Sequence, residues 1–425
     1  MYNKHELVVS RFFLVFVASL AALGPIGIDT YLPTLPNLAN DFSVDMATAN
    51  LTVSTFMMGM ALGQFLGGPL SDQIGRKKIG LIGLIIFMIC SALIAVASNI
   101  NQVLVLRLIQ AVGGGFASVI CMAQVRDVFE PKDVGKKFAN IILVILIAPM
   151  FAPSLGTLLS VYGWRTIFVA LSMISFLMLI IYVLRIPETH HDRPISFSFK
   201  EIYVGYWAAI TKRTNDHLIA LRYALFTGFS AGILFCYVTN AAFILIEHFE
   251  LSKAAFSAYF GLMVLALMFG NRITAKLMAA THLPTIIYWA NSVQLITAAL
   301  MVLLCAFTEP PFWQVIMGIA VLMACNGAIS PAAGGHFISL YSKNVGAASS
   351  LNATLMFAFG SLIGGLGALL SEGALLPIFS VMLASSLIAR LLLISARSKE
   401  TKTPILINWL WVESPIQRAH AIFIG

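Results

Sequence analysis

The sequence predicts an all-α membrane protein with twelve transmembrane helices arranged in two pseudo-symmetric six-helix halves. Three observations lead to this fold class. Of the 425 residues, 59% are apolar and only 10% are charged, whereas a soluble domain carries roughly a quarter charged residues. Apolar runs long enough to cross a bilayer recur along the chain, and the basic residues gather in alternate loops. A surface this apolar requires lipid as its solvent. The composition therefore excludes a soluble domain, a disordered chain and a nucleic-acid-binding protein.

Each span is expected where about 20 mainly apolar residues follow one another, because that length crosses roughly 30 Å of hydrocarbon. The twelve expected spans are 11–32, 47–70, 79–97, 101–124, 138–160, 164–184, 218–240, 254–276, 284–306, 312–334, 346–368 and 374–395. A β-barrel would instead need segments of about ten residues that alternate apolar and polar. Runs such as Ile79–Val96 are apolar on every face, which argues against a barrel.

The 26 Lys and Arg residues distribute among the loops as twelve spans require, since cytoplasmic loops collect basic residues. The loops after odd-numbered spans hold only Arg165 and Lys253, and Arg107 lies within a span. The formal charge of +8 is therefore an orientation signal that indicates cytoplasmic locations for both termini. Lys4 and Arg11 could introduce a signal peptide, but the apolar run continues past 20 residues and favours an uncleaved first span.

The longest polar interruption divides the chain between spans six and seven. We predict an N-terminal half over 1–184, a cytoplasmic linker over 185–217, a C-terminal half over 218–395 and a cytoplasmic tail over 396–425. The loop Gly68–Lys78 after span two has a weaker counterpart in Gly270–Lys276 after span eight. In transporters built from such repeats, the substrate binds near the midplane where the halves meet, and rocking of the halves alternates access.

The Gly68–Lys78 loop reads G-P-L-S-D-Q-I-G-R-K-K. Glycine permits the tight turn, Asp72 can cap a helix or pair with a base, and the basic residues hold the loop in the cytoplasm. The loop resembles the signature G-x-L-[SA]-D-x-x-G-R-[KR] of the major facilitator superfamily. The resemblance implies the major facilitator fold and a gating role, without substrate contact, for Gly68, Asp72, Gly75 and Arg76.

Two ionisable residues stand out well inside spans, Asp29 and Arg107. Each is costly there, about 2.5–3.5 kcal/mol at a helix centre. Asp29 lies in the Pro25–Pro36 segment, where prolines and a glycine disturb the helix beside a carboxylate. A carboxyl group in a site that opens and closes to water can bind and release a proton, so we expect the pair to couple transport to protons. Two alternatives remain open at this stage: Asp29 as a helix cap at the membrane surface, and Arg107 as a snorkelling side chain.

Further segments resemble proton-coupled drug antiporters. Arg107 and Gln110 lie three residues apart, hence on one helix face, and resemble the span-four signature R-x-x-Q-G-x-G with Ala111 in place of glycine. Span five, with Pro149, Pro153 and Thr157, is similar to the antiporter signature G-x-x-x-G-P-x-x-G-G, although alanines replace two glycines and Thr157 the last. We assign Pro149 and Pro153 to gating, because small residues and prolines every four positions make a kinked, closely packed helix face.

The Asp29-Thr30-Tyr31-Leu32-Pro33 element and Arg126-Asp127 most resemble the Bcr/CflA branch, the bicyclomycin- and chloramphenicol-type exporters. The segments Gly163–Phe168 and Pro187-Glu188-Thr189 resemble the wider drug:proton antiporter group. The resemblance implies a proton-driven exporter of small organic compounds in the inner membrane of a bacterium. A coupled importer or exporter of one metabolite would share every architectural feature, and remains the alternative.

The expected substrate cavity takes polar or aromatic span residues near the interface of the halves. These are Tyr31, Gln110, Tyr237, Asn240, Asn326 and Asn352. The serine-hydrolase pattern G-x-S-x-G at 228–232 lies in a span with no strand before it, so we expect no enzyme. Without a spaced His or Cys cluster or a phosphate-binding loop, we expect no metal and no cofactor beyond the coupling proton. The expected partners are the lipid bilayer and a small-molecule substrate, with the protein acting as a monomer.

Overall fold

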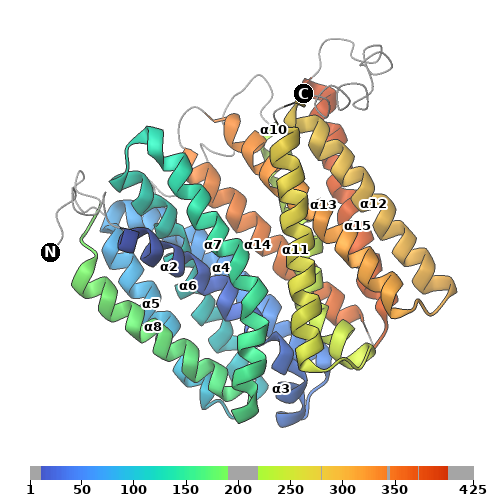
Figure 1. Cartoon of the computed structure of the whole chain (residues 1–425), viewed down its shortest axis with the longest axis horizontal. Helices are drawn as coiled ribbons and strands as arrows, with labels where there is room; N and C mark the ends of the chain where they lie inside the picture. The colour runs from blue at the N-terminus through green and yellow to red at the C-terminus, as the bar shows by residue number, and fades with distance from the viewer. Residues whose placement is uncertain (1–10, 190–218, 279, 342–344, 372, 401–425) are drawn as a thin grey trace, which may run out of the picture.

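The computed structural model describes residues 11–189, 219–278, 280–341, 345–371 and 373–400, and Figure 1 shows them as a bundle of long helices. The helices are α2 (Arg11–Asp29), α3 (Leu35–Asp41), α4 (Met46–Ile74), α5 (Arg76–Ala95), α6 (Ile100–Val128), α7 (Pro131–Leu159), α8 (Arg165–Arg185), α10 (Ile219–Ala242), α11 (Lys253–Leu277), α12 (Leu283–Phe307), α13 (Phe312–Ser339), α14 (Val345–Leu370) and α15 (Leu375–Glu400), with the short turns η1 (Leu32–Thr34), η2 (Ser160–Tyr162) and the π-helical η3 (Phe243–His248). The described residues contain no strand, and the predicted all-α membrane fold is confirmed. Residues 190–217 of the predicted linker and 401–425 of the predicted tail lie outside the described residues.

Eleven helical segments within the described residues are long and apolar enough to cross a membrane. The remaining expected span, 47–70, is the 29-residue helix α4. It buries polar side chains such as Asn50, Thr52 and Gln64. Because α4 packs between α6 and α14, protein rather than lipid covers much of its surface, and it can be less apolar than a lipid-exposed span.

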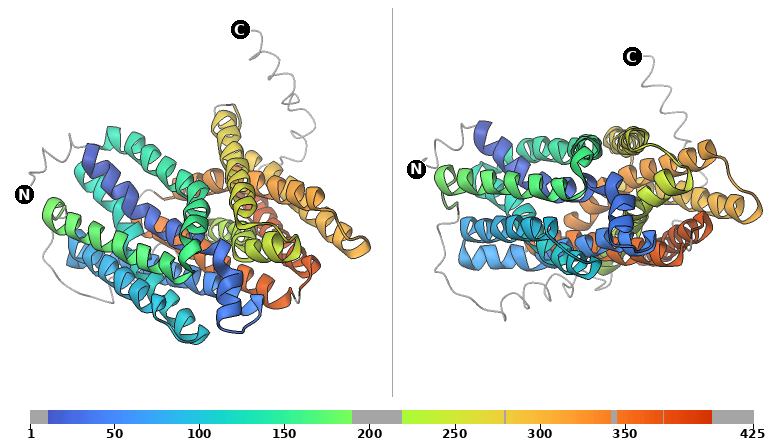
Figure 2. Two further views of the ribbon diagram at one scale, coloured as in Figure 1. Left: turned by 60° about the horizontal axis from the view of Figure 1, so that its bottom comes forward. Right: turned by 90° about the horizontal axis from the view of Figure 1, so that it is seen from below.

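The first span is longer than the expected 11–32. After α2 ends at Asp29, the chain continues through η1 and α3, and the apolar segment that could cross the membrane runs from Phe12 to Asp41. Pro33 and Pro36 occupy the first positions of η1 and α3. A proline there loses no helical hydrogen bond, because the first amides of a helix have no intrahelical partner. The prolines therefore redirect the helical chain rather than end the span, and Figure 2 shows α3 at the end of the bundle.

Side-chain caps help to fix where several helices begin. The Asp45 carboxylate accepts from the Thr48 amide at 2.8 Å at the start of α4. The Thr48 side chain and amide hold the pKa of this exposed carboxyl below its ordinary value. Asn99 and Ser252 make the corresponding hydrogen bonds at the starts of α6 and α11. These caps satisfy amides that a helix leaves without partners, and they lie at one end of the bundle, which we call the Trp164 end.

Figure 1 shows α2 to α8 gathered on one side of the molecule and α10 to α15 on the other. The main contacts between these groups join α4 to α14 and α7 to α11. Along α4, the Ser361 hydroxyl donates to the Ser54 carbonyl oxygen at 2.7 Å, and a Cβ on Gly68 would lie 2.9 Å from the Ser350 hydroxyl. Small residues thus allow α4 and α14 to approach closely.

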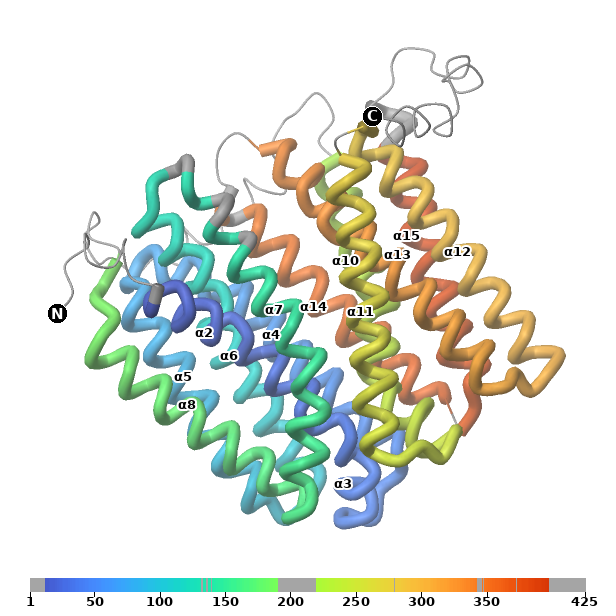
Figure 3. Tube along the Cα trace, viewed as in Figure 1, coloured from blue at the N-terminus to red at the C-terminus, as the bar shows by residue number. Residues whose placement is uncertain are grey.

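Contact between α7 and α11 is concentrated toward the Trp164 end. The Thr157 hydroxyl is hydrogen-bonded to the Ser257 hydroxyl at 3.0 Å and donates to the Lys253 carbonyl oxygen at 3.3 Å. Toward the opposite end, which carries Arg76, the two helices diverge (Figures 1 and 3). The two groups of helices are therefore held together at the Trp164 end on this face of the molecule.

Candidate functional site

Arg107 lies on α6 with its whole side chain buried. Its Nη1 donates to the Gly27 carbonyl oxygen on α2 at 3.0 Å and to Gln110 Oε1 at 2.9 Å. Gln110 in turn donates from Nε2 to the Ser91 hydroxyl on α5 at 2.6 Å. The predicted sharing of a helix face by Arg107 and Gln110 thus appears as a hydrogen bond, and it connects three helices. Snorkelling to the membrane surface does not describe this side chain.

Aromatic rings surround the Arg107 guanidinium. Its central carbon lies 4.1 Å from the ring centroid of Phe56, 4.4 Å from that of Tyr31 and 5.6 Å from that of Phe168. The Tyr31 hydroxyl is hydrogen-bonded to the Thr52 hydroxyl. Cation–π attraction supplies part of the stabilisation that a carboxylate would otherwise give. Two donors of the buried guanidinium, Nε and Nη2, have no hydrogen-bond partner among the described residues.

Asp29 is the last residue of α2 and is buried, with 5% of its surface exposed. The apolar helical segment that could cross the membrane continues past Asp29 to Asp41. Both interpretations of Asp29, proton coupling and a helix cap at the membrane surface, stay predictions. The carboxyl group interacts electrostatically with Tyr237 on α10, whose buried hydroxyl has no partner among the described residues. No ion pair joins Asp29 to Arg107, although Arg107 is hydrogen-bonded to the carbonyl oxygen of Gly27, two residues before Asp29.

Helix α7 packs directly against the backbone next to Asp29. A Cβ on Gly156 would lie 1.6 Å from the Thr30 carbonyl oxygen, so this position requires glycine. Pro149 and Pro153, assigned to gating from the sequence, both lie inside α7. The adjacent Thr157, one of the residues that depart from the antiporter signature, makes the hydrogen bonds to α11. The end of α7 therefore contacts both the Asp29 segment and the other group of helices.

The remaining cavity candidates lie apart from one another. Asn240 donates to the Gly364 carbonyl oxygen at 3.3 Å and is fully buried, and Asn326 donates to the Ser230 carbonyl oxygen at 2.7 Å. Asn352, on α14, is partly buried and directs its amide toward Met356 of its own helix. The structure thus brings Tyr31 and Gln110 to Arg107 and Tyr237 near Asp29. The three asparagines form hydrogen bonds elsewhere. Their role in binding a substrate stays a prediction.

The predicted gating residues form a cluster at the Arg76 end. Arg76 is buried, pairs with Asp72 one turn earlier and, through Nε at 3.1 Å, with Asp127 at the end of α6. Its backbone amide and that of Lys77 donate to the Glu188 carboxylate at 2.9 and 3.0 Å. This carboxylate binds the amides at the start of α5, where a helix favours negative charge.

Gly75 makes that arrangement possible. Its φ of 113° is unfavourable for a side chain, and a Cβ would lie 2.6 Å from the Glu188 carboxylate. The signature loop, the Arg126-Asp127 segment and the Pro187–Thr189 segment, separate in the sequence, are therefore one structural unit.

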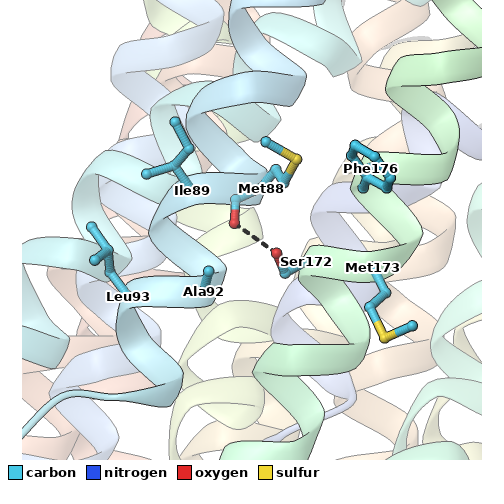
Figure 4. Close-up of a pocket in the computed structure, with 7 residues that line it drawn as sticks. All are labelled: Met88, Ile89, Ala92, Leu93, Ser172, Met173 and Phe176. Carbon is cyan, nitrogen blue, oxygen red and sulfur yellow. Dashed lines mark hydrogen bonds between the residues drawn. The ribbon is translucent and has the colours of Figure 1, made fainter.

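A shallow apolar groove of about 370 Å³ lies between α5 and α8 (Figure 4). Its lining residues are Met88, Ile89, Ala92, Leu93, Ser172, Met173 and Phe176. The only polar side chain among them is Ser172, whose hydroxyl donates to the Met88 carbonyl oxygen at 3.0 Å. Met173 and Phe176 are 62% and 51% exposed, so the groove opens on the outer surface of the bundle, away from the buried Arg107 centre.

Sequence reasoning missed several contributors to the Arg107 centre. Phe56 and Phe168 were not selected, because an aromatic residue in a span is ordinarily a packing residue. Ser91 gave no signal in a run of apolar neighbours. Their proximity to Arg107 depends on packing between helices distant in the sequence.

A family comparison matches residues 13–365 to the Major Facilitator Superfamily. The chain belongs to the major facilitator superfamily. This confirms the resemblance read from the Gly68–Lys78 loop. Membership, together with transporter-named relatives, makes the chain a multi-pass membrane transporter and not an enzyme.

Relatives within the superfamily carry drug-resistance names. A bicyclomycin resistance protein homologue from Haemophilus influenzae is 26% identical over 392 residues, covering 92% of this chain and 97% of that protein. A chloramphenicol resistance protein from Pseudomonas aeruginosa is 28% identical over 326 residues, covering 72% and 74%. The multidrug resistance protein MdtL of Klebsiella pneumoniae is 25% identical over 390 residues, covering 90% and 95%. The predicted likeness to the bicyclomycin and chloramphenicol group is confirmed.

Solved structures show the same major facilitator fold. A bacterial homologue of the human lysosomal transporter Spinster, inward-facing and unoccupied, superposes with a TM-score of 0.69 at 14% identity, covering 93% of this chain and all of that one. The nucleoside transporter NupG gives a TM-score of 0.67 at 12% identity, covering 90% and 99%. At such identities the likeness concerns the fold alone.

Proposed function

We propose that this transporter exports small organic compounds across the bacterial inner membrane in exchange for protons, by alternating access and as a monomer with both termini in the cytoplasm. The observation that carries the proposal is the pair of buried ionisable groups, Asp29 and Arg107: Arg107 is hydrogen-bonded to Gly27, two residues before Asp29, and the two side chains form no ion pair. Such groups are rare inside membrane spans and mark ion or proton pathways. The names of the drug-resistance relatives support export and a drug-like substrate.

The position of Asp29 supports a coupling role. It ends α2 at the point where the chain turns into η1, and its neighbour Thr30 is packed against Gly156 of α7. A shift of α7 relative to α11 would therefore change the surroundings of Asp29. We propose that Asp29 takes up a proton when its site opens outward and releases it when the site opens to the cytoplasm, where the substrate competes for the same polar region. The membrane potential adds about 2.3 kcal/mol per charge per 100 mV.

Arg107 is proposed to stabilise the ionised form of Asp29 during part of the cycle. Its Nε and Nη2 have no partner among the described residues, while a carboxylate is the partner that a guanidinium binds best. We further propose that the buried Tyr237 hydroxyl, which comes from the other group of helices and has no partner among the described residues, binds the protonated form. Protonation would thus change which partner Asp29 contacts.

Substitution of Asp29 tests the proposal. Asp29→Asn should abolish drug accumulation driven by a pH gradient in inside-out vesicles, while the purified protein remains folded and monodisperse. The matched control is Asp45→Asn, at an exposed cap where asparagine serves as well as aspartate. Transport against a gradient that persists in Asp29→Asn would refute the coupling role.

A drug-susceptibility panel addresses direction and substrate. Cells that lack their own exporters should become resistant to some compounds when they express the wild type, and a protonophore should remove that resistance. Uptake of a metabolite into cells, without resistance to any compound, would instead support the alternative of a coupled importer.

A further inference from the structure

A second buried polar cluster lies among α10, α12, α13 and α15, on the side of the molecule away from Asp29 and Arg107. Its side chains are at most 2% exposed. They belong to Ser230, Asn291, Gln294, Asn326 and Ser386. None of them carries a charge, and the proposed proton coupling does not use them as a group.

The hydrogen bonds of this cluster are long or incomplete. Asn291 Nδ2 and the Ser230 hydroxyl both donate to Gln294 Oε1, at 3.4 and 3.5 Å. Asn291 Oδ1 and Gln294 Nε2 have no partner among the described residues. Exchanging the nitrogen and oxygen positions of both amide groups would not supply the missing partners. The Asn291 amide nitrogen, a donor, and the Gln294 amide oxygen, an acceptor, would then have no hydrogen-bond partner instead. In either assignment, one donor and one acceptor remain.

Ser386 contributes a third buried atom without a partner in the described part of the chain, its hydroxyl oxygen. The preceding Ser385 donates to the Phe229 carbonyl oxygen at 2.6 Å, which places α15 beside Ser230. Arg390 Nη1 donates to the Tyr288 carbonyl oxygen at 3.1 Å and aligns α15 with α12. Ser386 lies about one turn before Arg390 and Asn291 about one turn after Tyr288, so in antiparallel helices the two side chains lie at the same level.

The cluster also parallels the Arg107 centre. Asn326 on α13 donates to the Ser230 carbonyl oxygen of α10, as Arg107 on α6 donates to the Gly27 carbonyl oxygen of α2. In the Arg107 centre, a cation and aromatic rings occupy the space between the helices. Here, neutral amides and hydroxyls occupy it.

We infer that this cluster binds water inside the membrane-spanning part of the protein. A cation does not suit this cluster, because it would meet amide donors as well as oxygens. An anion does not suit it either, because it would meet amide and hydroxyl acceptors without a neighbouring positive charge. Water both donates and accepts, and three polar partners are the usual number for a buried water molecule. Side chains buried to at least 98% leave no access for a larger ligand. The inference does not depend on the proposed drug export.

Infrared spectroscopy of the protein in lipid vesicles tests the inference directly. Buried water gives an O–H stretching band that shifts when H₂¹⁸O replaces ordinary water. The wild type should show a shifted band that the double variant Asn291→Leu/Gln294→Met lacks. Ser175→Ala is the matched control and should keep the band, because among the described residues this buried hydroxyl is hydrogen-bonded only within its own helix, to the Leu171 carbonyl oxygen. Identical isotope-sensitive bands in the wild type and the folded double variant would overturn the inference.

Two further measurements keep the inference falsifiable. If the double variant does not elute as a monodisperse species, Ser386→Ala removes one water partner with little change of volume and should move the band to a different frequency. Thermal unfolding in sodium chloride and in choline chloride should give the same midpoint. A sodium-specific rise in the wild-type midpoint that Ser386→Ala abolishes would identify a cation site and refute bound water.

Discussion

Replacing Arg107 with methionine should separate transport from stability. Methionine keeps most of the length of the side chain and removes its charge. The variant would still fill space next to Phe56 and Tyr31, whose ring centroids lie 4.1 and 4.4 Å from the central carbon of the guanidinium. We expect proton-driven transport to be lost and the folded protein to persist.

The expected change in stability is small because the lost attractions and the removed desolvation penalty oppose each other. The variant loses two hydrogen bonds from a charged donor, to Gly27 and Gln110, worth about 1.5–3 kcal/mol each. It also loses attraction to the two nearer rings, about 0.5–2 kcal/mol each. Against this, a buried charge without a carboxylate partner carries a desolvation penalty of several kcal/mol, which methionine removes. The free energy of unfolding should therefore fall by only a few kcal/mol, less than the roughly 4–10 kcal/mol of attraction that is lost.

Thermal unfolding in detergent and drug transport in proteoliposomes measure the two quantities on the same preparation. The control is Arg185→Met, at an exposed arginine in the last turn of α8, which should leave both unchanged. A destabilisation well above 4 kcal/mol in Arg107→Met would show that the guanidinium is required mainly for folding. Retained coupling to the pH gradient would refute its role in transport.

Three further predictions concern helix contacts. Gly156→Ala would place a Cβ 1.6 Å from the Thr30 carbonyl oxygen, so α7 must move. We expect thermal unfolding to show a destabilisation of about 1–3 kcal/mol. The control Gly335→Ala should be tolerated, because a Cβ there meets nothing within 4 Å. Thr157→Val removes the hydrogen bonds between α7 and α11. Spin labels on these two helices at the Trp164 end should then report longer distances. An unchanged distance distribution would argue against a contact that holds this end closed. Glu188→Gln weakens the hydrogen bonds that the first two amides of α5 donate to this side chain, and the free energy of unfolding should fall by about 1 kcal/mol. An unchanged free energy of unfolding would mean that water can bind these amides as well as the carboxylate does.

The helices could be predicted from the sequence because lipid imposes a simple requirement on length and polarity. The ends of the first span could not. Pro33 and Pro36 were interpreted as disturbing a helix, but each occupies an early position of a new helical turn, where it is tolerated. The difference matters, since it places Asp29 at the junction between α2 and η1 rather than within one continuous helix.

The candidate site was predictable where its members are close in the sequence. Arg107 and Gln110 share a face because they lie three residues apart, and they are hydrogen-bonded. The rings of Phe56 and Phe168 could not be foreseen, since their contact with Arg107 depends on how distant helices pack. The amide pair of Asn291 and Gln294 did leave a signal, two amides at helical spacing inside an expected span, but nothing in the sequence shows that both are fully buried.

The separation of Asp29 from Arg107 gives the proposed coupling its physical basis. An ionised carboxylate buried without a partner is costly, and so is a buried guanidinium. In the described conformation the guanidinium is held by the Gly27 carbonyl oxygen, two residues from Asp29. Pairing the two charges therefore requires α2 to shift relative to α6, and Thr30 cannot shift without displacing Gly156 of α7. Because the next residue of α7, Thr157, is bonded to α11, loss of the proton from Asp29 would favour release of the contact at the Trp164 end.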